Sequence, residues 1–314
     1  MASGILKILE FCTMRAASAC AYCSCARRLY WSFAERLLGE DEKLPEDADA
    51  AFRATYAELY DRHLVPLLFA PYAGYLADRV KAHKPRSVLE TAAGTGILTQ
   101  ALAQALPAEV TITATDLNQP MIDRARAKSA GPRIAWQRAD AMRLPFSNGS
   151  FELIVCQFGV MFFPDKKASF REAARVLTPR GRYLFAVWDD WKKMPDAPLA
   201  IAADVVAAML DCDPASLVNP GYHDETTLRE DLASAQFQRI KVECVMLPAA
   251  AASAREAAPA TVHGSLIRTV IETQHPGRLE EATNTVERAF EANFGKGTVV
   301  GRTSALIVTA ERNE

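Results

Sequence analysis

The chain has 314 residues, half of them hydrophobic, and a formal net charge of −2 at pH 7. This length suits two average domains, or one domain with extensions. The sequence has no run of about 18 uncharged apolar residues, which argues against a transmembrane helix. Its Lys and Arg residues are interspersed with Asp and Glu, which argues against a nucleic-acid partner. We therefore expect a globular, cytoplasmic protein.

The first 50 residues differ from the rest of the chain. Four of the seven cysteines lie among the first 25 residues, but no second Cys or His pair follows at zinc-finger spacing, so we predict no metal site. This basic, Ala- and Ser-rich start is also typical of a transit peptide, which leaves an organellar location open. The acidic stretch at 39–50 then has the composition of a solvated linker. We interpret residues 1–50 as an extension outside the core domain, which covers 51–314.

From residue 51 onward, hydrophobic periodicity predicts regular elements. Two helices come first, at 51–64 and 66–83, the second starting at Pro66 because proline is favoured at the first helical position. Strands and helices then alternate, which predicts an α/β fold with a doubly wound, mostly parallel sheet. The predicted strands are 87–90, 110–116, 133–137, 151–157 and 182–188, and the predicted helices are 96–106, 120–128 and 166–177.

The pattern changes after Trp188. A helix at about 197–210 and a second helix precede a strand at 239–247, and a last strand follows at 303–310. The helical segments between these two strands are far longer than a hairpin loop. We interpret residues 249–298 as a helical cap over the site.

The turn VLETAAGTG, residues 88–96, follows the first strand of the sheet. Such turns hold nucleotide cofactors, but the dinucleotide fingerprint needs a third small residue where this chain has Thr99. Glu90 would repel a pyrophosphate and suits a cationic cofactor. Asp116 can accept ribose hydroxyls, and Asp140 can accept from an amine such as that of adenine. Helix capping or an Asx-turn is the alternative for each acid taken singly, whereas all three together fit S-adenosylmethionine.

Four stretches carry a family resemblance: VLETAAGTG, TATDLN, RADAMRLPFSNGSFELIVCQFGVMFF and REAARVLTPRGRYLFAVWD. They resemble successive motifs of the class I S-adenosylmethionine-dependent methyltransferases, in the small-molecule branch that includes the ubiquinone and menaquinone C-methyltransferases. The resemblance is strong over 56–189 and weak over the final strands. It implies a Rossmann-like sheet of seven strands whose last strand is antiparallel, with S-adenosylmethionine as the cofactor.

The resemblance also implies where the cofactor lies. Gly94 and Gly96 would lie under its methionine portion, Asp116 would bind the ribose, and Leu117 would contact the adenine. The full set of implied cofactor residues is Glu90, Ala92, Gly94, Gly96, Asp116, Leu117, Met121, Asp140, Ala141 and Gln157. The chain departs from the family at Ala92, where a glycine is usual, and we expect the small methyl group to be tolerated.

Methyl transfer from a sulfonium is a one-step displacement, so the protein mainly aligns the reactants and removes a proton where needed. After the fourth strand, Gln157-Phe158-Gly159-Val160 replaces the Asn/Asp-Pro-Pro-aromatic stretch of methyltransferases that act on base amines. A small-molecule acceptor is therefore expected. The candidate acceptor-binding residues are Phe158, Phe162, Trp188 and Tyr222.

His263, in the predicted cap, is the first candidate for a catalytic base because imidazole titrates near neutrality. Tyr222 and His223 are second candidates. Two other functions stay open on the sequence: a non-catalytic subunit that binds S-adenosylmethionine for regulation or assembly, and a nucleotide-dependent dehydrogenase.

Overall fold

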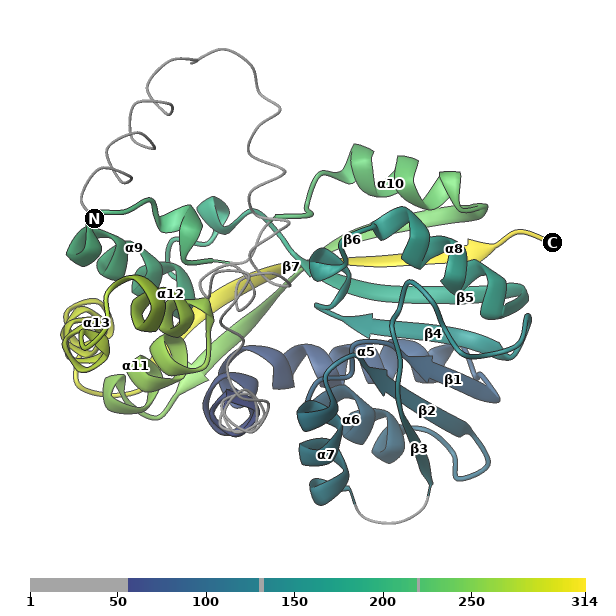
Figure 1. The fold of residues 1–314 in the computed structure, drawn as a ribbon, viewed down its shortest axis with the longest axis horizontal. Helices are drawn as coiled ribbons and strands as arrows, with labels where there is room; N and C mark the ends of the chain where they lie inside the picture. Colours follow the sequence, from purple (N-terminus) through teal and green to yellow (C-terminus); the bar gives the residue numbers. More distant parts are fainter. Residues whose placement is uncertain (1–55, 130–132, 219–220) are drawn as a thin grey trace, which may run out of the picture. The chain divides into compact units, whose positions relative to one another are not determined.

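A computed structural model describes residues 56–129, 133–218 and 221–314 (Figure 1). The chain divides into two units, Met1–Pro45 and Glu46–Glu314, and every described residue belongs to the second. The extension of residues 1–50 and its cysteines lie outside the described residues, so their separation from the core stays a prediction. Within the described part of the chain, no helix is long and apolar enough to cross a membrane.

The described strands form one seven-stranded sheet in the order β3-β2-β1-β4-β5-β7-β6. Neighbours from β3 to β5 pair in parallel, whereas β7 pairs antiparallel with both β5 and β6. This arrangement confirms the predicted doubly wound sheet with an antiparallel last strand. The strands are β1 (Ser87–Glu90), β2 (Thr111–Asp116), β3 (Ile134–Arg138), β4 (Phe151–Gln157), β5 (Leu177–Trp188), β6 (Phe237–Ala251) and β7 (Val299–Arg312).

Helices cover both faces of the sheet (Figure 1). Parallel strands joined by a helix form right-handed crossovers, so chain segments that wind in opposite directions from β1 place their helices on opposite faces. The helices on one side are α5 (Ala70–Ala82), α6 (Ile97–Ala105) and α7 (Gln119–Lys128), and those on the other are α8 (Lys166–Val176) and α10 (Glu225–Ser234). The strand order reverses between β1 and β4, and ligands bind at the carboxyl ends of strands beside such a point.

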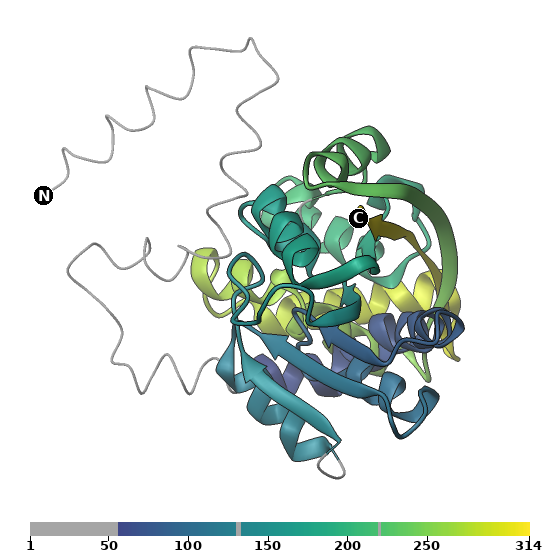
Figure 2. The same ribbon diagram turned by 90° about the vertical axis from the view of Figure 1, so that its right-hand side faces the viewer.

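The strands β6 and β7 continue beyond the end of β5. Trp188 at the end of β5 pairs with Ala305, while β7 goes on pairing with β6 as far as Val299 and Ala251. Figure 2 shows β6 as a long curved strand at the edge of the sheet. Both strands are longer than predicted because the residues next to the predicted cap pair with each other and not with the main sheet.

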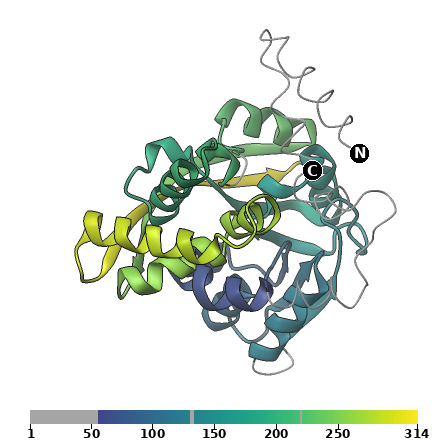
Figure 3. The ribbon, with the colours of Figure 1, turned by 60° about the vertical axis from the view of Figure 1, so that its left-hand side comes forward.

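Four helices pack around this projecting two-stranded ribbon and form a second hydrophobic core with Val299 (Figure 3). They are α9 (Pro198–Leu210), α11 (Ala254–His263), α12 (Leu266–Gln274) and α13 (Leu279–Phe294), and we call them the cap. The sequence analysis assigned the segment between the last two strands to the cap but left α9 out. Short 3₁₀ helices are η2 (Val160–Phe162), η3 (Trp191–Lys193) and η4 (Pro214–Ser216).

The predicted helix boundary at Pro66 is wrong. A π-helix, η1 (Tyr60–Phe69), contains Pro66 in its interior and runs directly into α5. In an α-helix an interior proline loses a hydrogen bond and its ring clashes with the carbonyl four residues earlier. A π-helix pairs residues that are five apart, so the carbonyl four residues before Pro66 does not need an N–H from this proline. The helix therefore continues through Pro66.

Gly301 of β7 lies where the chain approaches α9. A Cβ atom added there would overlap the carbonyl oxygen of Asp196 and lie 2.7 Å from Cδ of Pro198. We expect Gly301→Ala to lower the free energy of unfolding by about 1–3 kcal/mol, the range for overpacking, as measured by denaturant titration. Gly297→Ala is the control, because no atom lies within 4 Å of its added Cβ. Equal unfolding midpoints for the two variants would contradict this packing.

Candidate cofactor and active site

The turn between β1 and α6 has a left-handed backbone at three positions. The φ angles are 53° at Ala92, 55° at Gly94 and 81° at Gly96. A Cβ on Gly96 would lie 2.7 Å from the ring of Trp136, so this position needs glycine for close packing as well as for its φ angle. A Cβ on Gly94 would meet only the ring of Tyr60, at 4.0 Å. The turn is therefore packed tightly below Gly96 and open above Gly94.

The methyl group of Ala92 packs toward the end of β4. A Cβ built on Gly159 would lie 2.5 Å from Cβ of Ala92 and 2.8 Å from Sγ of Cys156. Ala92 thus occupies space that the missing side chain of Gly159 leaves free. This explains how the chain accommodates alanine where the family usually has glycine.

Glu90 ends β1 and is buried, with 1% of its surface exposed. Its Oε2 accepts a hydrogen bond of 2.6 Å from the hydroxyl of Thr99. Burial, with the nearby charge of Asp116, raises the pKa of Glu90 to about 8. The carboxyl group is therefore mostly protonated at pH 7 in the ligand-free protein and ionises readily only beside a cation. Thr99, which breaks the dinucleotide fingerprint, joins α6 to the end of β1.

Asp116 ends β2 and holds the turn in place. Its Oδ2 accepts from the backbone N–H of Gly94 at 2.9 Å, and its Oδ1 accepts from that of Asn118 at 2.8 Å. Burial raises the pKa of Asp116, and these backbone hydrogen bonds oppose the rise. A carboxylate has about four acceptor positions, so Asp116 keeps capacity for ribose hydroxyls. Beyond it, Leu117 is half-buried and Met121 of α7 is buried.

Asp140 follows β3 and forms the local turn that the sequence analysis gave as the alternative to a binding role. Its Oδ1 accepts from the backbone N–H of Met142 at 2.8 Å. Asp140 and its neighbour Ala141 are both half-buried. This hydrogen bond uses one of the two carboxylate oxygens, so turn formation and contact with an adenine amine are compatible.

Two buried polar atoms near this turn have no hydrogen-bond partner among the described residues. They are Oδ1 of Asn118, which follows β2, and Oε1 of Gln157 at the end of β4. The amide nitrogen of Gln157 donates to the backbone oxygen of Phe69 at 2.8 Å, which fixes the side chain. A buried acceptor without a donor costs about 1–3 kcal/mol. The ammonium, hydroxyl and amine groups of S-adenosylmethionine would supply such donors, so these residues fit that cofactor.

Asn118 and Asp61 are site residues that the sequence analysis missed. Asn118 could have been found in the TATDLN motif, where it follows the acid by two positions. Asp61 of η1 accepts from Thr95 of the turn at 2.8 Å and from Arg124 of α7 at 3.0 Å, and it also pairs with Lys128. Burial would raise the pKa of Asp61, but the hydrogen bonds from these partners lower it below its usual value. Asp61 thereby fastens the π-helix to the turn, a contact for which the sequence held no signal.

An aromatic cluster joins the ends of β4 and β5 to η1 and α5. The rings of Phe158 and Trp188 stack with centroids 3.7 Å apart, and Tyr72 lies edge-on to both. Phe69 packs on the same two rings at 5.5 and 5.9 Å. The structure thus brings Phe158 and Trp188 together, but Phe158 is 4% exposed and lies behind Trp188. Phe162, in η2, is half-buried.

A mostly apolar pocket, partly open to solvent, lies beside Trp188. The residues that line it come from η1, the end of β5, η3, the loop after it, α9, the loop before α10, and β7. They are Leu68, Trp188, Asp189, Trp191, Met194, Ala197, Leu199, Ala200, Val218, Gly221, His223 and Thr303. Of the four predicted acceptor residues, Trp188 lines this pocket. Tyr222 instead donates its hydroxyl to Asp231 of α10 at 2.8 Å.

His263 lies at the end of α11, within the cap. Its Nε2 is 3.0 Å from the hydroxyl of Thr283 in α13. Burial and the nearby Arg268 lower the pKa of His263. It is not among the residues that line the pocket, so its role as a base stays a prediction. Among the described residues no group of three or more His, Cys, Asp or Glu side chains is placed to bind a metal ion.

The contact between Ala92 and Gly159 can be tested by stability. We expect Gly159→Ala to lower the free energy of unfolding by about 1–3 kcal/mol through overpacking. Ala92→Gly removes one of the two clashing atoms, so it should recover part of this loss in the Gly159→Ala background. Denaturant titration of the two single variants and the double variant measures this coupling. Strictly additive effects would show that the two residues do not share this space.

Comparisons with known proteins agree with this geometry. Residues 88–181 match the family described as a methyltransferase domain. A demethylmenaquinone methyltransferase of Deinococcus radiodurans is 39% identical over 108 residues, which are 34% of this chain and 44% of that protein. A ubiquinone/menaquinone biosynthesis C-methyltransferase of Idiomarina loihiensis is 32% identical over 114 residues, 35% of this chain and 45% of that protein. The matched segment thus spans less than half the length of these relatives.

The fold has a counterpart among solved structures. The YcgJ protein of Bacillus subtilis matches 77% of this chain with 98% of its own, at a TM-score of 0.51 and 18% sequence identity. That likeness supports the fold, and the sequence matches supply the family. The predicted resemblance and the predicted cofactor, S-adenosylmethionine, are confirmed. Residues 88–181 therefore match a methyltransferase domain, in line with the predicted resemblance to the class I S-adenosylmethionine-dependent methyltransferases.

Proposed function

We propose that this protein transfers a methyl group from S-adenosylmethionine to a small, largely apolar acceptor held in the pocket beside Trp188. The observation that carries the proposal is the position of this pocket. It opens at the carboxyl end of β5, and the stacked pair of Trp188 and Phe158 links it to the end of β4. Gln157, the residue before Phe158, belongs to the cofactor turn region. Donor and acceptor sites thus lie at one edge of the sheet.

Each side of the site has its own residues in this proposal. Asp116 and Asn118 bind the nucleoside, Gln157 and Glu90 bind the cationic end, and Gly94 lets the cofactor approach the backbone. When bound, S-adenosylmethionine supplies an electrophilic methyl group on a sulfonium. The protein aligns the acceptor with that group and excludes water. The cap and η1 contribute Leu68, Leu199 and other apolar side chains to this exclusion.

The acceptor class follows from the walls of the pocket. Two tryptophans, Trp188 and Trp191, and several aliphatic side chains line it, and aromatic walls favour flat, apolar molecules. The names of the relatives, which include demethylmenaquinone methyltransferase, point in the same direction. A small aromatic acceptor therefore fits this chain better than a nucleic acid or a protein.

The main test is turnover with labelled S-adenosylmethionine against a panel of phenols, quinols and small acids. We expect methyl transfer to at least one aromatic member and none to the nucleobase controls. Asp116→Ala removes up to two charge-assisted hydrogen bonds worth about 1.5–3 kcal/mol each. Affinity for S-adenosylmethionine, measured by calorimetry, should then fall by roughly a hundredfold or more.

Wild-type protein that binds S-adenosylmethionine but methylates no member of the panel would contradict the proposed acceptor class. Unchanged cofactor affinity in Asp116→Ala would contradict the role of this carboxylate. NAD serves as the control ligand, because the turn lacks the third small residue that a pyrophosphate-binding turn requires.

Glu90 should make the stability of the ligand-free protein depend on pH. Its pKa is raised from 4.5 to about 8 in the folded state. The folded state therefore holds the proton more tightly, and the resulting stabilisation is complete below pH 4.5 and is lost as the pH rises to 8. Glu90→Gln resembles the protonated, uncharged form of Glu90, so its stability should not fall in this pH range for this reason. We expect the stability of wild type relative to Glu90→Gln to fall by at most about 1.4 kcal/mol per pH unit in that window.

Denaturant titrations of both proteins at pH 5, 6, 7 and 8 measure this difference. Saturating S-adenosylmethionine should flatten the curve, because a cation beside Glu90 favours its charged form. A constant difference across the four pH values would show that Glu90 is already ionised in the folded, ligand-free protein.

A further inference from the structure

The loop before α10 places an imidazole in the wall of the acceptor pocket. Gly221 and His223 both line this pocket, beside Trp188 and Asp189. The Nδ1 atom of His223 is buried and has no hydrogen-bond partner within the described parts of the chain. Nearly all buried polar atoms in folded proteins are paired, so an unpaired one calls for an explanation.

The ring of His223 packs against the backbone of Gly221. A Cβ atom on Gly221 would lie 2.6 Å from Nδ1 and 2.7 Å from Cε1 of this ring. Because Nδ1 is buried against Gly221 without a partner, Nε2 is the ring nitrogen that can hydrogen-bond to a ligand, and it donates in the tautomer that carries its proton there. His223 therefore offers the pocket a hydrogen-bond donor at Nε2.

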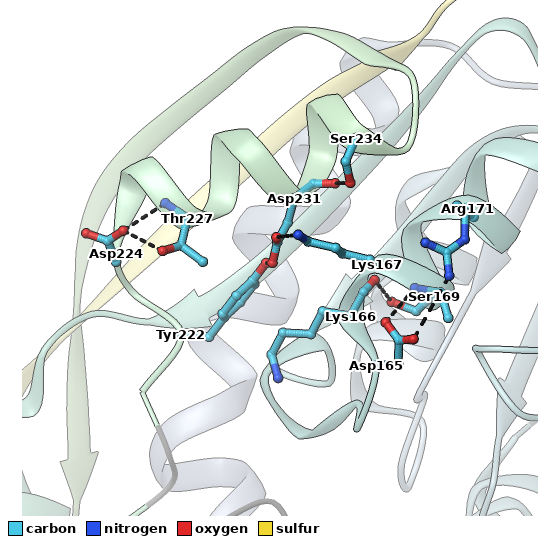
Figure 4. A network of polar contacts seen from close by, with 11 residues as sticks. Asp165, Lys166, Lys167, Ser169, Arg171, Tyr222, Asp224, Thr227, Asp231 and Ser234 are labelled. Atoms are coloured by element: carbon cyan, nitrogen blue, oxygen red, sulfur yellow. Dashed lines mark hydrogen bonds and ion pairs between the residues drawn. The ribbon is translucent and has the colours of Figure 1, made fainter. Parts of the chain in front are cut away.

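The two neighbours of His223 in the chain, Tyr222 and Asp224, make contacts with α8 and α10 (Figure 4). Before it, Tyr222 donates to Oδ2 of Asp231 at 2.8 Å, and Oδ1 of Asp231 lies 3.3 Å from the ammonium group of Lys167. The ammonium group of Lys166 lies 5.0 Å from the ring centre of Tyr222. After it, Asp224 caps α10 by accepting from the backbone N–H of Thr227 at 2.7 Å. Both neighbours of His223 are thus tied to helices that pack on the sheet.

A second polar group in the wall is the carboxylate of Asp189, which is 7% exposed, and Thr303 also lines the pocket. It accepts hydrogen bonds from the N–H of Asp190 at 2.8 Å and from Lys193 at 3.1 Å. Burial alone would raise the pKa of Asp189, but these hydrogen bonds lower it below its usual value. The pocket wall therefore holds an ionised carboxylate whose charge is paired with that of Lys193, so it gives an anionic acceptor no net attraction. The tryptophans suit a flat ring, and His223 suits an oxygen atom on that ring.

We infer that His223 is an acceptor-binding residue whose Nε2–H donates a hydrogen bond to an oxygen of a flat, uncharged aromatic acceptor. Tyr222 and Asp231 are positioning residues that act through His223. This inference rests on the proposed function, because it concerns the acceptor side of the same site. It gives Tyr222 a part in acceptor binding without contact with the acceptor.

The test uses the full chain saturated with S-adenosylhomocysteine and titrated calorimetrically with 2-naphthol, an uncharged aromatic alcohol. We expect His223→Ala to weaken 2-naphthol binding by about tenfold, the effect of one hydrogen bond of about 1.4 kcal/mol. His223→Gln should keep most of the affinity because its amide nitrogen reaches the place of Nε2, whereas His223→Asn should not. Naphthalene, which lacks the oxygen, should bind wild type and His223→Ala equally.

His83→Ala is the control histidine variant, because His83 ends α5 at the opposite, amino edge of the sheet and lines a different pocket. Equal 2-naphthol affinity in wild type and His223→Ala overturns the inference. Two other results also overturn it. One is that His223→Asn keeps the affinity for 2-naphthol while His223→Gln loses it, and the other is that the wild-type protein does not bind 2-naphthol. A wild-type protein that does not bind S-adenosylhomocysteine would instead overturn the proposed function.

The positioning role has a separate readout. Tyr222→Phe keeps the ring and removes only the hydroxyl that binds Asp231, so it should weaken 2-naphthol binding in wild type. In the His223→Ala background it should have no further effect, because its partner is gone. Additive losses in the double variant would show that Tyr222 does not act through His223.

Discussion

The candidate cofactor site depends on the carboxylate of Asp116, which accepts hydrogen bonds from the backbone N–H groups of Gly94 and Asn118. These two bonds join the turn after β1 to the turn after β2, so two strand ends share one rigid support. The turn has a left-handed backbone at Ala92, Gly94 and Gly96, and Asp116 bonds to the middle one of these positions. In the proposed function, the same carboxylate would also bind the ribose. Stability of the turn and affinity for the cofactor would then depend on one side chain.

A cluster of four aromatic rings joins the ends of β4 and β5 beside the proposed acceptor pocket. Trp188 faces the pocket, Phe158 lies behind it, and Phe69 and Tyr72 hold both rings from η1 and α5. The hydroxyl of Tyr72 donates to the backbone oxygen of Thr303 at 2.9 Å, which ties this cluster to β7.

The predictions that held came from residues close together in the chain. Strand and helix alternation identified β1 to β5, and the acids at the ends of β1 and β2 follow directly from those strands. The boundary predicted at Pro66 was wrong because a π-helix holds this proline in its interior, and no local sequence pattern indicates a π-helix. Asp61 was missed for a similar reason: its partners Thr95, Arg124 and Lys128 are 34 to 67 positions away.

The sequence alone determined the sheet, the family and the cofactor turn, because hydrophobic periodicity and a short Gly-containing motif are local properties of the chain. The tertiary structure decided which side chains form the acceptor pocket. Tyr222 and His223 are adjacent in the sequence, yet one turns toward Asp231 and the other lines the pocket. His263 and Thr283 meet only because α11 packs on α13. Such contacts depend on how distant elements pack, and packing is set by the whole core and not by any one segment.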